Sequence, residues 1–425
     1  MAFFFNHADP SSVFRLYKDS VTRPCPQVAG DTVQACESAG GGISLGLAEY
    51  LSLAPNGIAW VATRGPTLLA SHVFTLMSLS IATAGIFLLT TAPYSWLVQN
   101  AVDRQIVALL LALLPLGMGY LLNNLTYSQW NLLFLSFVLL ARPLPQSVPA
   151  LLGHGLATVG AIISHPLSIL VLPLCLIHLR LARRWSQRVC VTCYICVAFL
   201  YQTLGVGHST PLHLSLSSLV FAAKVFVSRV CFETVFGAHA TTTLIVSGSA
   251  RYVYLLGMVT LAGVVFLALA DKPTSWQSAA QVGVLVTAFA LVFASGSARY
   301  TGAARMVYLE DPYLQRYVYV PKLMFAVLLL SLVVPYLRAV LAAQRILPAA
   351  GIWVAFSLYL LAVNIDNSFL YDSSELEGKR VTSFLIAVDE DVRRARSGVP
   401  YTPEHALHKE EGWDVVMNID QHLGK

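Results

Sequence analysis

The chain contains very long intervals without a charged side chain. Asp, Glu, Lys and Arg are absent between Arg64 and Asp103, between Arg104 and Arg142, and between Arg142 and Arg180. About 20 consecutive apolar residues are enough to cross a bilayer as a helix, so each interval can hold one or two crossings. Only 12% of the residues are charged, against about 25% in an average soluble protein. The sequence therefore excludes a cytosolic globular protein and a disordered chain, and it predicts an all-α polytopic membrane protein.

We expect about ten transmembrane helices, joined mostly by short connections. They span residues 68–96, 104–122, 128–141, 147–163, 166–179, 189–205, 252–270, 276–296, 322–338 and 346–364. The third and fifth are short for a crossing, so we expect them to tilt or to lie inside the protein. Residues 213–237 are apolar but carry Ser217, Lys224 and Ser228 at helical spacing, which predicts an interfacial helix along the outer leaflet. The alternative is one more crossing, which would reverse the orientation of all later segments.

Charge divides the chain into three regions. Residues 1–65 form a polar segment with four basic and five acidic side chains. The transmembrane body, residues 66–364, carries sixteen basic and five acidic side chains, whereas residues 365–425 carry seven basic and twelve acidic ones. This last region is too polar to enter a membrane, so we expect a small soluble C-terminal appendix. Because the basic residues of the body are spread over its connections, we expect no nucleic-acid partner.

The basic connection Arg180–Arg188 determines the expected orientation. Its four arginines and its lack of acidic residues place it in the cytoplasm. Counting crossings from it puts residues 1–65, the loop 297–321 and residues 365–425 outside, with an outer turn at 164–165. An outer N-terminal segment usually follows a signal or a crossing, so we expect a parent design of eleven crossings, with the first one upstream.

Two of the seven cysteines, Cys25 and Cys36, lie in the polar N-terminal segment. If that segment faces an oxidising compartment, the two can form a disulfide. Cys190, Cys193 and Cys196 have the spacing of metal ligands, but no histidine lies near them in the sequence. We interpret them as small apolar residues rather than as a metal site.

Seven of the sixteen basic residues of the body fall in expected outer loops, against the usual preference for the cytoplasmic side. They are Lys224, Arg229, Arg251, Arg299, Arg305, Arg316 and Lys322. Guanidinium groups bind phosphate oxygens through a bidentate fork, and tyrosine offers a ring face to a sugar at the membrane interface. Since tyrosine directly follows Arg251, Arg299 and Arg316, these pairs indicate a site for a phosphate-linked lipid with a sugar head. The alternative is a belt of interfacial anchors.

The loop 297–321 ends in Arg316-Tyr-Val-Tyr-Val-Pro321, directly before a late crossing. Together with the Ser164-His165-Pro166 turn and Glu411-Gly-Trp413, this pattern resembles bacterial membrane glycosyltransferases of the GT-C superfamily. The layout is similar too, with many crossings, a long first outer loop, helices lying flat on the membrane and a small outer C-terminal portion. The resemblance implies a polyprenyl-phosphate-linked sugar as donor and an extracytoplasmic active face on the bacterial inner (plasma) membrane.

The resemblance also implies a catalytic acid. In that superfamily an acidic residue of the first outer loop acts as general base toward the acceptor hydroxyl. A position near the start of the loop favours Asp9 and Asp19. The other acids of the loop are Asp31, Glu37 and Glu49.

Substrate contacts would come from the outer loops and turns. The implied substrate-binding residues are Arg251, Arg299, Tyr300, Arg305, Arg316, Tyr317, Tyr319 and His165. The arginines would stabilise the departing lipid phosphate. For His165 the alternative is a structural hydrogen-bonding role. The pattern requires no cofactor; Glu310 and Asp311 are the candidates for a divalent metal, and the alternative for them is a salt-bridged surface patch.

Other functions stay open. The chain lacks the paired-acid motif and the first crossing of the superfamily pattern, which leaves room for a close non-catalytic relative. An O-antigen polymerase or ligase would also bind lipid-linked sugars through outer arginines, without needing a first-loop acid. A lipid or solute transporter or flippase is the third class. No charged residue lies near the middle of an expected crossing, which argues against an ion-coupled transporter.

Overall fold

The computed structural model describes a helical protein with one small sheet. The described residues are 67–113, 128–174, 184–204, 215–270, 275–294, 316–343, 383, 386–388, 390–391, 393–407 and 415–418. The helices in chain order are α3 (Thr67–Leu88), η2 (Ala92–Tyr94), α4 (Ala101–Leu113), α6 (Ser128–Ala141), α7 (Val148–Ile162), η3 (Pro166–Val171), α9 (Trp185–Leu204), α10 (Leu216–Val225), η4 (Phe226–Phe232), α11 (Glu233–Phe236), α12 (Ala238–Val246), α13 (Ala250–Ala270), α14 (Ser275–Val292) and α16 (Arg316–Ala343).

The sheet lies in the C-terminal region and was not expected from the sequence. Strands β1 (Glu404–Leu407) and β2 (Val415–Asn418) pair antiparallel, with Glu404 opposite Asn418. Just before them the Asp391 carboxylate accepts a hydrogen bond from the backbone N–H of Thr402 at 3.2 Å. The described part of the body is helical, as the uncharged intervals predict.

Two described helices are long and apolar enough to cross a membrane, and they differ sharply in burial. These spans are Ala250–Leu269 in α13 and Tyr317–Arg338 in α16. Only 22% of the α13 span is buried inside the protein, against 83% of the α16 span. Large apolar side chains of α13, such as Leu255 and Phe266, are exposed. A helix that is apolar all round and exposed suits contact with lipid, so α16 is the central helix and α13 a peripheral one.

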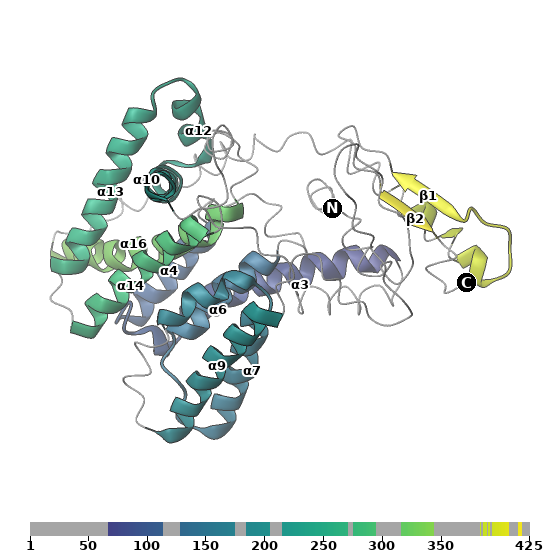
Figure 1. The fold of residues 1–425 in the computed structure, drawn as a ribbon, viewed down its shortest axis with the longest axis horizontal. Helices are drawn as coiled ribbons and strands as arrows, with labels where there is room; N and C mark the ends of the chain where they lie inside the picture. The colour runs from purple at the N-terminus through teal and green to yellow at the C-terminus, as the bar shows by residue number, and fades with distance from the viewer. Residues whose placement is uncertain are drawn as a thin grey trace.

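In Figure 1 α16 lies among the other helices of the body, beside α14 and α4. It packs against α14, α4, α6 and η4. Its boundaries differ from the expected crossing, because Arg316–Pro321, expected in the outer loop, form its first turns. Pro321 lies inside the helix, at its sixth residue, where proline removes one backbone hydrogen bond. Such a proline is tolerated in membrane helices because neighbouring helices can satisfy the freed carbonyl group.

Other expected crossings also have different bounds. The second, 104–122, is described as the shorter helix α4, and residues 114–122 lie outside the described residues. The fifth, 166–179, begins as the 3₁₀ helix η3 rather than as an α-helix. The tenth, 346–364, lies outside the described residues. Ten crossings therefore stay a prediction.

The segment expected as an interfacial helix is helical from Leu216 to Phe236, through α10, the π-helical η4 and α11. In Figure 1 α10 is seen end-on whereas α13, α14 and α16 are seen along their length, so it runs across them. Lys224 is exposed as expected, but Ser228 is fully buried, so the polar positions do not share one wet face. The helix ends at Gly237, whose φ of 85° is readily available only to glycine, and α12 follows.

One ion pair joins two connections that are both expected in the cytoplasm. The buried carboxylate of Asp103, in the first turn of α4, lies 3.1 Å from Nε of Arg338. Asp103 precedes the second expected crossing and Arg338 ends the ninth. Their contact places these two ends of α4 and α16 at one level, as a common cytoplasmic face requires.

Candidate functional site

Three aromatic side chains from distant parts of the chain meet where α6 and α16 begin. The ring of Trp130, on the first turn of α6, lies 4.5 Å from the ring of His165 and 5.6 Å from that of Tyr317, centroid to centroid. The Tyr317 ring meets the indole edge-on, a favourable geometry for aromatic pairs. Trp130 and His165 are buried, whereas Tyr317 is partly exposed. All three lie at chain positions that the sequence predicts to be at the outer membrane surface.

His165 is held in place by the start of η3. Its backbone is extended, and its ring Nδ1 accepts a hydrogen bond from the backbone N–H of Leu167 at 3.1 Å. Pro166 occupies the first helical position, where its missing N–H costs nothing. The imidazole is thereby fixed against Trp130, and the structural role that the sequence left open for His165 is present in this turn.

A buried hydrogen bond lies beside the aromatic group. The Tyr319 hydroxyl donates to Oδ1 of Asn131 at 2.9 Å, and both side chains are buried. Asn131 follows Trp130 on α6, and Tyr319 is two residues beyond Tyr317 on α16. We call Trp130, Asn131, His165, Tyr317 and Tyr319 the aromatic cluster. The structure thus brings together three residues that the sequence singled out, with two from α6 that it did not.

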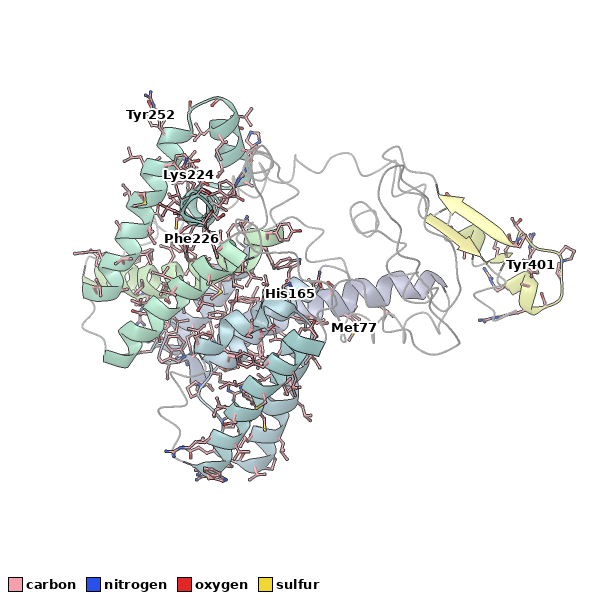
Figure 2. All side chains as sticks on the ribbon, viewed as in Figure 1. Met77, His165, Lys224, Phe226, Tyr252 and Tyr401 are labelled. Atoms are coloured by element: carbon pink, nitrogen blue, oxygen red, sulfur yellow. The ribbon has the colours of Figure 1, made fainter. Side chains whose placement is uncertain are left out.

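The remaining predicted site residues are not in this cluster. Arg251 is exposed, with its guanidinium 4.9 Å from the ring centre of Tyr252. Figure 2 places Tyr252 at the far end of α13, well away from His165, so Arg251 belongs to a different surface. The backbone of Arg316 opens α16, but its side chain lies outside the described residues. Also outside them are Asp9, Asp19, Arg299, Tyr300, Arg305, the metal candidates Glu310 and Asp311, and the disulfide candidates Cys25 and Cys36.

A buried group of charges lies deeper, between η4, α11 and α16. Glu233 Oε1 is 2.6 Å from Lys322 Nζ, and its Oε2 is 3.0 Å from a guanidinium nitrogen of Arg229. Arg229 also donates to the Thr242 hydroxyl at 3.0 Å. All three charged side chains are at most 3% exposed. We call Arg229, Glu233 and Lys322 the charge triad.

The charge triad corrects one interpretation of the sequence. Arg229 and Lys322 were expected in outer loops, available to an anion, but both are buried and ion-paired with Glu233. Glu233 itself was missed, because a single acid in an apolar segment has no motif. The available signal was its spacing of four residues from Arg229, which places both on one helix face.

A second buried polar network joins α6, α7 and α9. The Cys190 thiol donates to the Tyr194 hydroxyl at 2.9 Å, that hydroxyl lies 2.8 Å from His154 Nδ1, and His154 Nε2 lies 3.1 Å from the Leu139 carbonyl oxygen. His154 is therefore a core residue of the helical body. Cys193 and Cys196 are exposed on α9, and in the described residues no three His, Cys, Asp or Glu side chains are grouped as metal ligands would be.

No family model, curated protein or solved structure matches the chain.

Proposed function

We propose that the protein is an integral membrane glycosyltransferase of GT-C type, which moves a sugar from a polyprenyl-phosphate carrier to an acceptor on the extracytoplasmic face. The observation that carries this proposal is the aromatic cluster at the start of α16. It joins His165, Tyr317 and Tyr319, all implied by the superfamily pattern, although His165 and Tyr317 are 152 positions apart in the chain. The cluster follows directly on Arg316, the arginine of the motif.

The chemistry of the cluster fits a sugar next to a phosphate. Trp130 contacts the Tyr317 ring edge-on, and the Tyr317 side chain is partly exposed. Aromatic side chains at such a position suit contact with a sugar ring. Arg316 is the first residue of the same helix and directly precedes Tyr317 in the chain, and arginine is the side chain best suited to bind phosphate oxygens through a bidentate fork. The phosphate and the sugar are adjacent groups in the donor. Arg316 and Tyr317, which would bind them, are adjacent residues of α16.

The transfer step uses groups from the outer loops. The acceptor hydroxyl oxygen forms a bond to the anomeric carbon of the sugar, and its proton passes to a carboxylate, for which Asp9 and Asp19 are the candidates. The bond from the anomeric carbon to the phosphate oxygen breaks, and its electron pair stays on the lipid phosphate. Arg299, Arg305 and Arg316 would stabilise that charge.

The membrane arrangement belongs to the same proposal. Ten crossings, a cytoplasmic Arg180–Arg188 connection and an outer loop 297–321 place the start of α16 at the outer surface of a bacterial inner membrane. Two observations support this arrangement. The aromatic cluster gathers three expected outer positions at one end of α16, and the Asp103–Arg338 pair gathers two expected cytoplasmic positions near the other.

The test is the substitution of Arg316. Arg316→Ala removes a charge-assisted contact worth about 1.5–3 kcal/mol, so binding of undecaprenyl phosphate in detergent should weaken roughly 10- to 100-fold. Arg316→Lys should recover only part of the affinity, because an ammonium cannot form the bidentate fork. Arg188→Ala, on the expected cytoplasmic side, is the matched control and should bind like the parent. Equal binding by all four proteins would overturn the proposed site.

The catalytic acid is tested separately. Asp9→Asn or Asp19→Asn should abolish sugar transfer while donor binding persists, because only proton removal is lost. Transfer that survives both substitutions would favour the polymerase or ligase class.

The charge triad favours one alternative, a transporter or flippase. Ionisable residues inside a membrane domain are expensive and often mark a transport pathway. That function would make the triad, rather than Arg316, essential for movement of a lipid-linked sugar across proteoliposomes.

A further inference from the structure

The charge triad joins two helices that run across each other. Arg229 and Glu233 are four residues apart on the helix Leu216–Phe236, so their contact is made within one helix. Lys322 comes from α16, so its 2.6 Å contact with Glu233 links that helix to α16. The link is inaccessible to water, since Glu233 and Lys322 side chains are 2% and 1% exposed. Buried ions are stable only when paired, so this contact permits few relative positions of the two helices.

The helical segment that carries Arg229 is π-helical rather than α-helical. Arg229 lies in the π-helical residues Phe226–Phe232, and Glu233 follows them directly. A π-helical stretch adds a residue to the turn and occurs often at functional sites. Here Arg229 contacts both Glu233 and Thr242 of α12, and the other carboxylate oxygen of Glu233 contacts Lys322 of α16.

Lys322 lies on the face of α16 that also carries Tyr319. The two are three residues apart, which puts them on neighbouring positions of one face, about 4.5 Å apart along the axis. Tyr319 contacts Asn131 of α6, and Lys322 contacts Glu233 of α11. The outer end of α16 therefore makes one polar contact with each of two neighbouring helices.

Lys322 is a charged side chain among apolar neighbours. The positions next to it are buried and apolar, including Val320, Leu323 and Met324. Van der Waals packing holds membrane helices together, and a buried polar contact adds discrimination between registers, because a shifted register leaves its polar groups unpaired. Rotation of α16 about its axis would separate Lys322 from Glu233.

We propose that Glu233 and Lys322 are positioning residues for the aromatic cluster: their ion pair fixes the rotation of α16 that presents Tyr317 to Trp130. This inference rests on the proposed function, in which Tyr317 faces the sugar of the donor. The triad touches no substrate; it acts through the helix that carries Arg316, Tyr317 and Tyr319. Without it, the donor contacts would be present but misaligned for transfer.

The experiment measures the fluorescence emission of Trp130, which reports on the surroundings of its ring in the aromatic cluster. The chain has seven tryptophans, so the Trp130 signal is taken as the difference between each protein and the same protein carrying Trp130→Phe. A buried indole emits at short wavelength, and Trp130 is 5% exposed. Lys322→Met keeps the length of the side chain and removes its charge. It should shift the Trp130 emission to longer wavelength.

Two variants serve as controls. Arg338→Gln breaks the ion pair with Asp103 near the opposite end of α16, so it tests whether any lost ion pair disturbs the helix. It should leave the Trp130 signal unchanged. Lys322→Arg keeps the charge and should restore most of the parent signal. If Lys322→Met does not fold, the double variant Glu233→Gln with Lys322→Met, which removes both charges of the pair, should give the same shift.

The outcomes separate this inference from the proposed function. A Trp130 signal that is unchanged in both Lys322→Met and the double variant overturns the positioning role. A shift in Arg338→Gln as large as that in Lys322→Met also overturns it, since the triad would then be one structural contact among others. A selective shift together with parent protein that does not bind undecaprenyl phosphate supports the positioning role and refutes the proposed donor. In an active enzyme, Lys322→Met should lower kcat at least tenfold while KM for the donor changes less.

Discussion

Gly257 offers a test of how closely the helix Leu216–Phe236 is held against the membrane body. This glycine of α13 lies against Val227 in η4, and a Cβ added to it would lie 2.8 Å from Val227 Cγ1 and would also collide with the Val227 carbonyl oxygen. Rotating the valine side chain cannot relieve a collision with backbone. The two helices would have to separate, which disturbs the packing that brings Glu233 to Lys322. Overpacking of this kind costs about 1–3 kcal/mol.

The matched control lies on the same helix. Gly263 is six residues further along α13, and a Cβ added there would meet nothing within 4 Å. Replacing a helical glycine with alanine gains about 0.5–1 kcal/mol from helix propensity, and this gain applies to both positions. Gly263→Ala should therefore be neutral or slightly stabilising. Gly257→Ala should be less stable than Gly263→Ala by about 1–3 kcal/mol, which is the cost of the contact alone.

The assay is reversible unfolding in mixed micelles, with increasing SDS and helix content followed by circular dichroism. Both variants and the parent are measured at one protein concentration. If Gly257→Ala is as stable as Gly263→Ala, then α13 and η4 do not approach as closely as their backbones indicate. The close contact between α13 and η4, which determines where Glu233 lies relative to Lys322, would then be wrong.

Two further predictions follow from the cluster and from the orientation. Tyr319→Phe removes the hydrogen bond to Asn131 and should lower the free energy of unfolding by about 0.5–1.5 kcal/mol in the same assay, whereas a Tyr319→Phe protein as stable as the parent would show that this contact contributes nothing. A C-terminal fusion to alkaline phosphatase should be active and one to green fluorescent protein dark, because residues 365–425 are expected outside; the opposite result would reverse the orientation of the tail.

Part of the candidate site could be found from the sequence because its residues stand at helix ends. His165 lies beside a proline in an expected turn, and Tyr317 and Tyr319 follow an arginine at the edge of an apolar run. Such positions are visible because composition changes there. Trp130 and Asn131 also begin a helix, yet nothing in their own neighbourhood distinguishes them from an ordinary interfacial pair. Their role depends on contacts with residues 35 and 188 positions away.

The interfacial helix shows where sequence patterns are insufficient. The spacing of Ser217, Lys224 and Ser228 predicted a polar face, and the prediction of a helix holds. Ser228 is nevertheless buried, because α13 and α16 cover the later turns of that helix. For the same reason Arg229 is buried and paired with Glu233 rather than facing an outer anion. Hydrophobic periodicity describes one helix in isolation, and it does not say which neighbours will cover a polar position.

The sequence by itself determined that this chain is helical and rich in apolar segments, because continuous apolar intervals of this length are typical of helices whose backbone hydrogen bonds are satisfied within each segment. It also located the ends of several helices, since prolines, arginines and tyrosines gather there. Only the tertiary structure decided that α16 is central and α13 peripheral, although both are equally apolar, and that Glu233 is shared by Arg229 and Lys322. The physical reason is that helix formation depends on residues three or four positions apart, whereas burial and ion pairing depend on how several helices pack at once.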